Sequence, residues 1–214
     1  MTTTKFFRPA LGISLLVVLG SVITSVEGQQ QMKSQSENSL GQFEQFQIGH
    51  PSFVSPHASP IAVNNNLVFV ANTPADTVDI IDSQTRDVIA RVDVGVDPVS
   101  IARRPDGKEV WVSNHVSDSV SVIDTDESSP TFLNVIATVQ EFDTARKATN
   151  FDEPMGIAFA SNEKAYVALS SNNQIAVIDV ASREVMKRLT ITAQDPREIV
   201  VRDGKLYVIP FESN

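Results

Sequence analysis

Short apolar runs separated by polar bends dominate the chain from residue 50 onward, and no stretch there keeps apolar residues at helical spacing for three turns. Runs rich in Val and Ile, with turn signals about every eight to twelve residues, predict an all-β sandwich, barrel or propeller. The runs form a unit of four strands, labelled a to d here. Strand a follows a proline, strand b is centred on an aromatic residue, strand c ends in Asp, and strand d leads to the next unit.

These strands recur in register along the chain. Strand a covers 60–63, 98–102, 154–159 and 196–201; strand b contains Phe69, Trp111, Tyr166 or Tyr207; strand c covers 78–82, 120–124 and 175–179; strand d covers 88–92, 135–139 and 184–189. The aromatic residues follow one another after 42, 55 and 41 residues. Four short strands in about 40 residues are typical of a β-propeller blade.

The pattern predicts a partial β-propeller over 50–214. Its blades cover about 57–95, 96–140 and 153–192, and a fourth begins at 195–214. Propellers normally need four to eight blades to close a ring. We therefore expect the chain to be the N-terminal part of a longer propeller, and self-assembly into a ring is the alternative.

Two polar insertions lengthen the second unit. Residues 126–132 enlarge its c–d turn, and residues 141–152 enlarge its link to the third unit. Both insertions are expected to be surface loops, which carry function more often than strands do. Within the second insertion, residues 142–151 could hold one short helical turn.

The second unit carries a specific set of motifs. It reads Asp-Pro at 97–98, Pro-Asp-Gly-Lys at 105–108, Trp-Val-Ser-Asn at 111–114 and Ser-Val-Ser-Val-Ile-Asp-Thr at 119–125. These motifs closely resemble the YVTN-type β-propeller repeat family, and the likeness extends over about residues 57–214. The resemblance implies an exported, periplasmic or surface-layer protein, typically with seven blades. It implies no single activity, because such relatives include binding modules, surface-layer components and propellers attached to haem- or quinone-dependent redox domains.

The N-terminus resembles a secretory signal. Lys5 and Arg8 precede an apolar stretch at 10–26, and small residues follow near position 28. An uncleaved anchor is the alternative, because the stretch of about 17 residues is at the lower limit for spanning a bilayer. Residues 29–49 are rich in Gln, Ser and Glu and are expected to be a disordered linker. The predicted location is the periplasm or the cell surface.

Composition restricts the partners. The 214 residues include 17 basic and 26 acidic ones, for a formal net charge of -9, which argues against nucleic acid as the main partner. No polybasic run indicates binding to anionic lipid, so no membrane contact is expected beyond the N-terminal segment. The chain has no Cys, which excludes disulfides, Cys-ligated zinc and covalently attached c-type haem within these residues.

Three acids precede the strand-a prolines, namely Asp97, Glu153 and Asp195. Because strand a lies nearest the channel of a propeller, they are expected at equivalent positions around one mouth. A ring of acids could hold a hard cation such as Ca²⁺ or attract a cationic ligand. The alternative is that an acid before proline favours an extended, turn-forming dipeptide.

His57 and His115 are expected on that same face and could line one site with the acids. A haem or metal role is conceivable because His is a common metal ligand, although no second His at ligand spacing supports it. Exposed or structural roles are the alternative. No firm metal site is predicted, and no cofactor is expected in this segment apart from Ca²⁺.

Other conspicuous residues have structural explanations. Asp82, Asp124 and Asp179 end strand c and could be acids or bases, but their repetition favours hydrogen bonds to the following turn. Trp111 is expected to pack in the core or between blades. The chain has no glycine-rich phosphate loop, no Gly-x-Ser-x-Gly and no His-Glu-x-x-His. Catalytic residues are therefore not predicted.

The sequence favours a binding or scaffold module at the cell envelope, which recognises a small molecule or a protein through loops on one propeller face. One alternative is the propeller part of a larger periplasmic redox enzyme, linked to haem or quinone, whose catalytic domain lies beyond residue 214. A second alternative is a structural protein of a surface layer.

Overall fold

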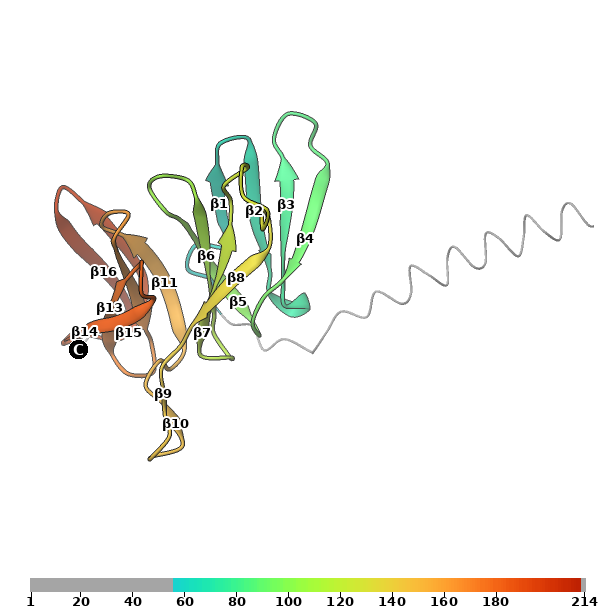
Figure 1. Ribbon diagram of the computed structural model, residues 1–214. Coiled ribbons are helices and arrows are strands. Elements are labelled where there is room, and N and C mark those ends of the chain that lie inside the picture. The colour runs from blue at the N-terminus through green and yellow to red at the C-terminus, as the bar shows by residue number, and fades with distance from the viewer. Residues whose placement is uncertain (1–55, 213–214) are drawn as a thin grey trace, which may run out of the picture. The chain divides into compact units, whose positions relative to one another are not determined.

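The computed structural model describes residues 56–212, which form antiparallel sheets side by side (Figure 1). Strand order follows the chain in each of the three four-stranded sheets. The first blade contains β1 (Ile61–Asn64), β2 (Leu67–Asn72), β3 (Thr77–Asp82) and β4 (Val88–Asp93). The second contains β5 (Pro98–Arg103), β6 (Glu109–Asn114), β7 (Ser119–Asp124) and β8 (Val135–Val139). The third contains β11 (Pro154–Phe159), β12 (Lys164–Leu169), β13 (Gln174–Asp179) and β14 (Glu184–Thr190).

Two strands, β15 (Gln194–Arg202) and β16 (Lys205–Glu212), follow as a hairpin and correspond to strands a and b of a fourth unit. The predicted all-β architecture and the order of strands a to d are therefore confirmed. The predicted signal peptide at 1–28 and the expected linker at 29–49 lie outside the described residues. Within residues 56–212, no helix is long and apolar enough to cross a membrane.

The blades pack through two kinds of sheet face. Neighbouring residues of a strand point to opposite sides, so the aromatic residue of strand b faces one way and its two neighbours face the other. We call these sides the aromatic face and the aliphatic face, and we call the packed interface between consecutive blades a seam. Each seam joins the aromatic face of one blade to the aliphatic face of the next: Phe69 clusters with Val110 and Val112, Trp111 with Ala165 and Val167, and Tyr166 with Leu206 and Val208.

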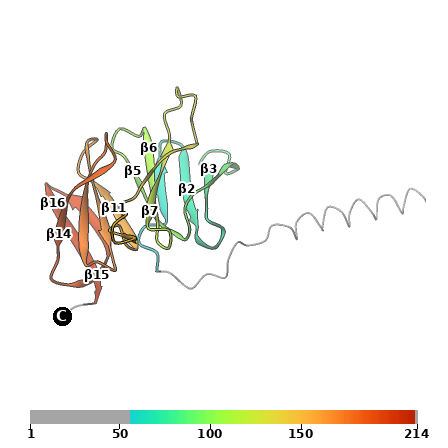
Figure 2. The ribbon, with the colours of Figure 1, turned by 60° about the horizontal axis from the view of Figure 1, so that its bottom comes forward.

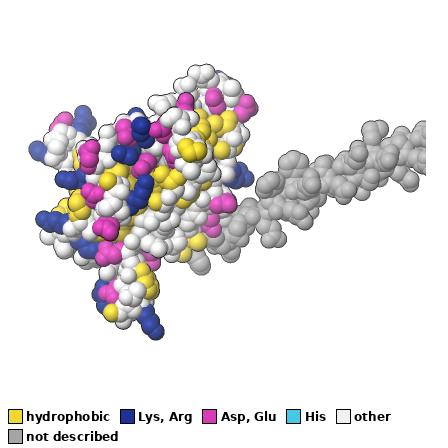
Figure 3. Space-filling model, viewed as in Figure 1, with side chains coloured by type: hydrophobic (Ala, Val, Ile, Leu, Met, Phe, Trp, Pro, Cys, Tyr) yellow, Lys and Arg dark blue, Asp and Glu magenta, His cyan; other side chains and the backbone are white. Residues whose placement is uncertain are grey.

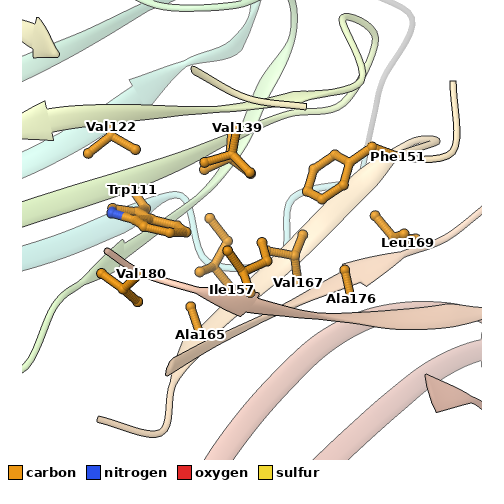
Figure 4. Packing of buried hydrophobic residues seen from close by; sticks show 12 residues of the cluster. Trp111, Val122, Val139, Phe151, Ile157, Ala165, Val167, Leu169, Ala176 and Val180 are labelled. Atoms are coloured by element: carbon orange, nitrogen blue, oxygen red, sulfur yellow. The ribbon is translucent and has the colours of Figure 1, made fainter. Parts of the chain in front are cut away.

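Trp111 occupies the seam between the second and third blades (Figure 4) and is fully buried, which confirms its predicted packing role. Its ring meets the edge of Phe159 with centroids 5.2 Å apart. Its Nε1 donates a hydrogen bond of 2.8 Å to the carboxylate of Glu109. That carboxylate also accepts a 3.1 Å bond from Arg183 of the third blade. The seam therefore combines apolar packing with a charged link at its rim.

The second insertion differs from the expectation. Instead of a helical turn it forms the hairpin β9 (Phe142–Asp143) and β10 (Ala148–Thr149). The expected helical turn is wrong because the carboxylate of Asp143 accepts the backbone N–H groups of Ala145 and Arg146, which closes a tight turn between the two strands. The side chain of Arg146 also binds Asp143 at 2.7 Å.

The first insertion is a surface loop, as predicted. Asp126 fastens it by accepting bonds from Lys108 at 2.9 Å and from the hydroxyl of Ser128 at 2.6 Å. Lys108, and then Ser128, lower the pKa of Asp126 to about 2. Because the pKa of Asp126 is lower in the folded protein, these contacts stabilise the fold above the ordinary Asp pKa and are lost as the pH falls through about 2.

We predict that Trp111→Ala lowers the free energy of unfolding by about 3–5 kcal/mol, because it opens a cavity across the seam. Trp111→Phe should cost less, about 1–2 kcal/mol, since it keeps an aromatic ring and loses the bond to Glu109. Urea unfolding measures both changes. Ile89→Ala, at a side chain 49% exposed, is the control and should cost little. If Trp111→Ala and Ile89→Ala lowered the free energy of unfolding equally, the buried position of Trp111 in the seam would be contradicted.

Candidate functional site

The b–c bends and the d–a links emerge at one edge of the sheets, which we call the loop face. It comprises the bends at 73–76, 115–118 and 170–173 and the links at 94–97, 140–153 and 191–193. In Figure 1 the bends after β2 and β6 lie on the same side as the hairpin β9–β10. All five candidate site residues lie on or beside this face.

A repeated hydrogen bond links each bend to the next blade. In each case the side-chain oxygen of the last bend residue accepts the backbone N–H of the acid before the strand-a proline. The pairs are Asp76 with Asp97 at 2.9 Å, Asp118 with Glu153 at 3.0 Å, and Asn173 with Asp195 at 2.7 Å. In the structure, each of these three acids therefore links two successive blades through its backbone N–H group.

The backbone of these acids is left-handed rather than extended. The φ angles are +64° at Asp97, +47° at Glu153 and +54° at Asp195. The expected extended dipeptide is therefore wrong at these positions. The left-handed turn aims the N–H group back at the preceding bend, and Asp adopts it more readily than most residues.

The structure brings His57, Asp97 and His115 to the junction of the first two blades. The Nε2 of His57 lies 2.6 Å from the hydroxyl of Thr73, which donates a 2.7 Å bond to the carbonyl of Pro98. Because that hydroxyl has only one hydrogen to give, it accepts the bond from Nε2 of His57. The backbone N–H of His115 donates to the carbonyl of Asp97 at 2.9 Å.

Several polar atoms at this junction have no hydrogen-bond partner. They are Oδ2 of Asp97, Oδ1 of Asn114 and Nδ1 of His115. Asp97 is only 2% exposed and Asn114 is fully buried. Buried polar groups are nearly always paired, so unpaired ones are candidates for contact with a ligand. The junction is therefore a candidate polar site.

Glu153 and Asp195 lie apart from this junction, on later blades. Glu153 is exposed, and its Oε2 lies 3.2 Å from the hydroxyl of Ser170. Asp195 is paired with Arg197 at 2.7 Å, and this guanidinium lies 3.9 Å from the ring centroid of Phe211. In the part of the chain that the structure describes, no three His, Asp or Glu side chains are grouped to hold a metal ion. Calcium binding by the three acids stays a prediction.

A pocket of about 210 Å³ lies on the loop face between the second blade and the hairpin β9–β10. Its lining residues are Ser117, Asp118, Gln140, Glu141, Phe142, Lys147, Ala148 and Thr149. Phe142 is 59% exposed and gives the pocket an apolar wall, while Asp118 provides a carboxylate. In Figure 3 hydrophobic atoms are visible on the projecting hairpin. The insertion singled out from the sequence thus forms half of a pocket.

The surroundings of Asp118 shift the pKa of its carboxyl. Burial raises the pKa of its carboxyl, and the carboxylates of Asp152 and Glu153 raise it further, against the lowering effects of the Glu153 N–H and of His115. The carboxylates of Asp152 and Glu153 add negative charge beside Asp118. A cation there would relieve this repulsion.

The acids at the ends of strand c have turn roles, as predicted. Asp82 accepts backbone N–H bonds from Gln84 and Thr85, and Asp179 accepts one from Ser182 at 2.8 Å. The bonds from Ser182 lower the pKa of Asp179. Asp124 accepts the N–H of Asp126 at 3.0 Å in the same way. These residues belong to the c–d turns and do not contribute to the pocket.

The sheets, the seams and the loop face together define a β-propeller fold. No protein-family model matches the chain, and no curated protein matches it. Among solved structures, the chain is similar to hydrazine synthase from Kuenenia stuttgartiensis, with 30% identity and a TM-score of 0.59, covering 77% of this chain and 45% of that one.

Two further solved structures support the fold alone. The β-propeller domain of Myceliophteria thermophila Cps50 (Swd1) has 14% identity and a TM-score of 0.58, covering 71% of this chain and 50% of that one. Virginiamycin B lyase from Staphylococcus aureus has 16% identity and a TM-score of 0.55, covering 71% and 48%. The chain therefore spans about half the length of the solved structures it matches.

We predict different outcomes for two changes at Asp118. Asp118→Ala removes the acceptor for Glu153 and should lower the free energy of unfolding by about 1 kcal/mol. Asp118→Asn should keep this bond, because Asn173 makes the same bond to Asp195 at 2.7 Å in the next blade. Urea unfolding at neutral pH separates the two variants.

The raised pKa of Asp118 also predicts a pH effect. Since the folded protein holds this proton more tightly than the unfolded chain, its contribution to stability is present at low pH and is lost as the pH rises through the raised pKa. Asp118→Asn should remove this part of the decline, which begins at the ordinary Asp pKa of about 3.9 and continues upward through the raised pKa. Identical pH profiles for the wild type and Asp118→Asn would contradict the assignment.

Proposed function

We propose that this chain is an exported β-propeller module of the cell envelope that binds a ligand or a protein partner through its loop face. The observation that carries the proposal is the pocket of about 210 Å³ between the second blade and the hairpin β9–β10. The resemblance to YVTN-type repeats and the predicted signal peptide support export. The module recognises its partner, and the sheets hold the recognition loops in place.

The pocket favours a small ligand group that carries positive charge. Asp118 lines it, and the acids Asp152 and Glu153 act on the same carboxyl. The exposed ring of Phe142 supplies a surface on which an ammonium group can rest. Lys147 also lines the pocket and would pair with an anionic group on the far side of such a ligand.

The geometry keeps this pocket rigid. The hairpin is tied to the third blade by an ion pair of 2.5 Å between Glu141 and Arg188. The bend of the second blade is tied to the same link by the bond from the N–H of Glu153 to Asp118. Because both walls are fastened before a ligand arrives, less conformational entropy is lost on binding.

One observation favours a second candidate function, the propeller part of a larger redox enzyme. The chain is 30% identical to hydrazine synthase over 77% of its length, and it spans 45% of that enzyme. In this function the propeller would support catalytic groups that residues 1–214 do not include. A reading frame that continues past the codon for Asn214 into a haem-binding Cys-x-x-Cys-His motif would favour this candidate.

A titration tests the pocket. We expect choline and putrescine to bind the full chain, and glutarate to bind more weakly, in calorimetry at low salt. Asp118→Asn should weaken the binding of choline about tenfold, because a charged partner of the ammonium group is lost. Asp87→Asn, the same change at an exposed c–d turn, is the matched control and should leave binding unchanged.

Two outcomes would count against the binding of a cationic ligand at this pocket. One is tighter binding of glutarate than of choline, and the other is equal binding of choline by the wild type and Asp118→Asn. Because Asp118→Asn is expected to fold normally, a loss of binding in this variant reports on charge rather than on unfolding.

A further inference from the structure

Exposed apolar side chains are concentrated on the loop face. Outside the outer strands β4, β8 and β14 and the strands β1, β15 and β16 at the ends of the row, three large apolar side chains are exposed. They are Val96 at 36%, Val116 at 60% and Phe142 at 59%, and all three belong to the loop face. The opposite edge, made of the a–b and c–d turns, exposes no large apolar side chain in the part of the chain that the structure describes.

Val96 and Val116 are held side by side by their backbones. The N–H of Val116 donates to the carbonyl of Val96 at 3.3 Å, and the N–H of Val96 donates to the hydroxyl of Ser117 at 2.9 Å. Gly95 lets the link lie this close to the bend, because a Cβ atom there would come within 2.4 Å of the Ser117 hydroxyl. The link and the bend therefore display the two valine side chains on a fixed support.

The other blades show that the fold does not require valine at these two positions. The residue before the acid of the strand-a turn is Val96 at the first junction, but it is Asp152 and Gln194 at the next two. The second residue of the b–c bend is Val116 in the second blade, but it is a proline in the first and Ser171 in the third. Since the same turns form without these valines, recognition explains their exposure better than folding does.

The valine pair adjoins the pocket beside Asp118. Ser117, which accepts the bond from Val96, also lines that pocket, and Phe142 lines it from the hairpin. Apolar side chains therefore lie on both sides of a pocket that contains a carboxylate. Figures 1 and 2 both show the second blade between the first and the third, so this surface lies within the row of sheets rather than at its ends.

A small free cation does not cover this whole surface. A group such as choline fits the pocket of about 210 Å³ and contacts Phe142, but Val96 and Val116 are not among the lining residues. A Lys or Arg side chain enters the same pocket, and its neighbours in a protein chain reach the apolar side chains on both sides. A buried basic anchor with apolar contacts around it is typical of protein interfaces.

The charges around the pocket fit such a partner. Asp152 and Glu153 add negative charge beside Asp118, which favours a basic side chain and repels the headgroups of anionic lipids. Lys147 also lines the pocket and has N–H groups to donate. A protein segment offers backbone carbonyl groups that accept them, whereas an alkylammonium ion has no acceptor.

We propose that the loop face binds a segment of another protein in which one Arg or Lys is flanked by aliphatic side chains. The basic side chain enters the pocket and pairs with Asp118. The flanking side chains cover Val96 and Val116 on one side and Phe142 on the other. The inference rests on the proposed function and adds that the cationic group belongs to a protein segment.

Two peptides test the flanking contacts separately from the charge, in calorimetry of the full chain at low salt. Acetyl-Leu-Arg-Leu-amide should bind about fivefold more tightly than acetyl-Gly-Arg-Gly-amide, because its leucines leave water on the loop face. Val116→Ser introduces the residue type that the third blade has at this position. It should abolish the advantage of the leucine peptide and leave the binding of the glycine peptide unchanged.

Two controls accompany these measurements. Ile136→Ser makes a comparable change at a side chain of β8 that is 39% exposed, and it should preserve the advantage of the leucine peptide. Acetyl-Leu-Glu-Leu-amide should bind most weakly of the three peptides, since its carboxylate meets the acids of the pocket. Circular dichroism checks that both variants keep their sheet content.

The possible failures are distinguishable. Equal affinity of the wild type for the two arginine peptides would overturn the inference and leave the cationic pocket standing, whereas no binding of either peptide would overturn the proposed function as well. An advantage of the leucine peptide that persists in Val116→Ser would contradict the role of the valine pair. Binding of phosphatidylglycerol vesicles that Val116→Ser abolishes would identify a membrane surface as the partner instead.

Discussion

The packing of an aromatic face against an aliphatic face is the interaction on which the rest of this structure depends. Strand alternation gives every sheet two unlike sides, so one kind of contact can be repeated from blade to blade. Trp111 illustrates the contacts within one seam: it is fully buried, its ring packs against Phe159, and its Nε1 donates a hydrogen bond to Glu109. The bends and the pocket take their positions from these seams.

The sequence predicts the regular part of the fold because that part depends on local patterns. Alternating Val and Ile, the recurring aromatic residue and the turn-forming Asp82 and Asp179 are all visible in short windows. The bend residues Asp76 and Asp118 could not be recognised in the same way. Their side chains bond to the next blade, and their only composition signal is a recurring polar residue before strand c. The left-handed backbone of their partners, Asp97 and Glu153, has no composition signal of its own.

In the candidate site too, some features could be predicted from the sequence and others depend on contacts that the sequence does not reveal. The insertion at 141–152 was recognisable as a functional loop, but its hairpin was not, because the turn depends on one carboxylate accepting two N–H groups. His57 and His115 do lie at one junction, as their positions suggested. Asp195 does not join them, since it is paired with Arg197, a contact between side chains that spacing alone cannot reveal.

We propose that the loop face recognises a ligand at the pocket beside Asp118. The most direct test is a ¹H–¹⁵N correlation spectrum of the full chain during a titration with choline. We expect the amide shifts to concentrate at 115–118 and 140–149, the segments that line the pocket or adjoin it. Shifts confined to the c–d turns on the opposite edge, or none at saturating choline, would contradict it.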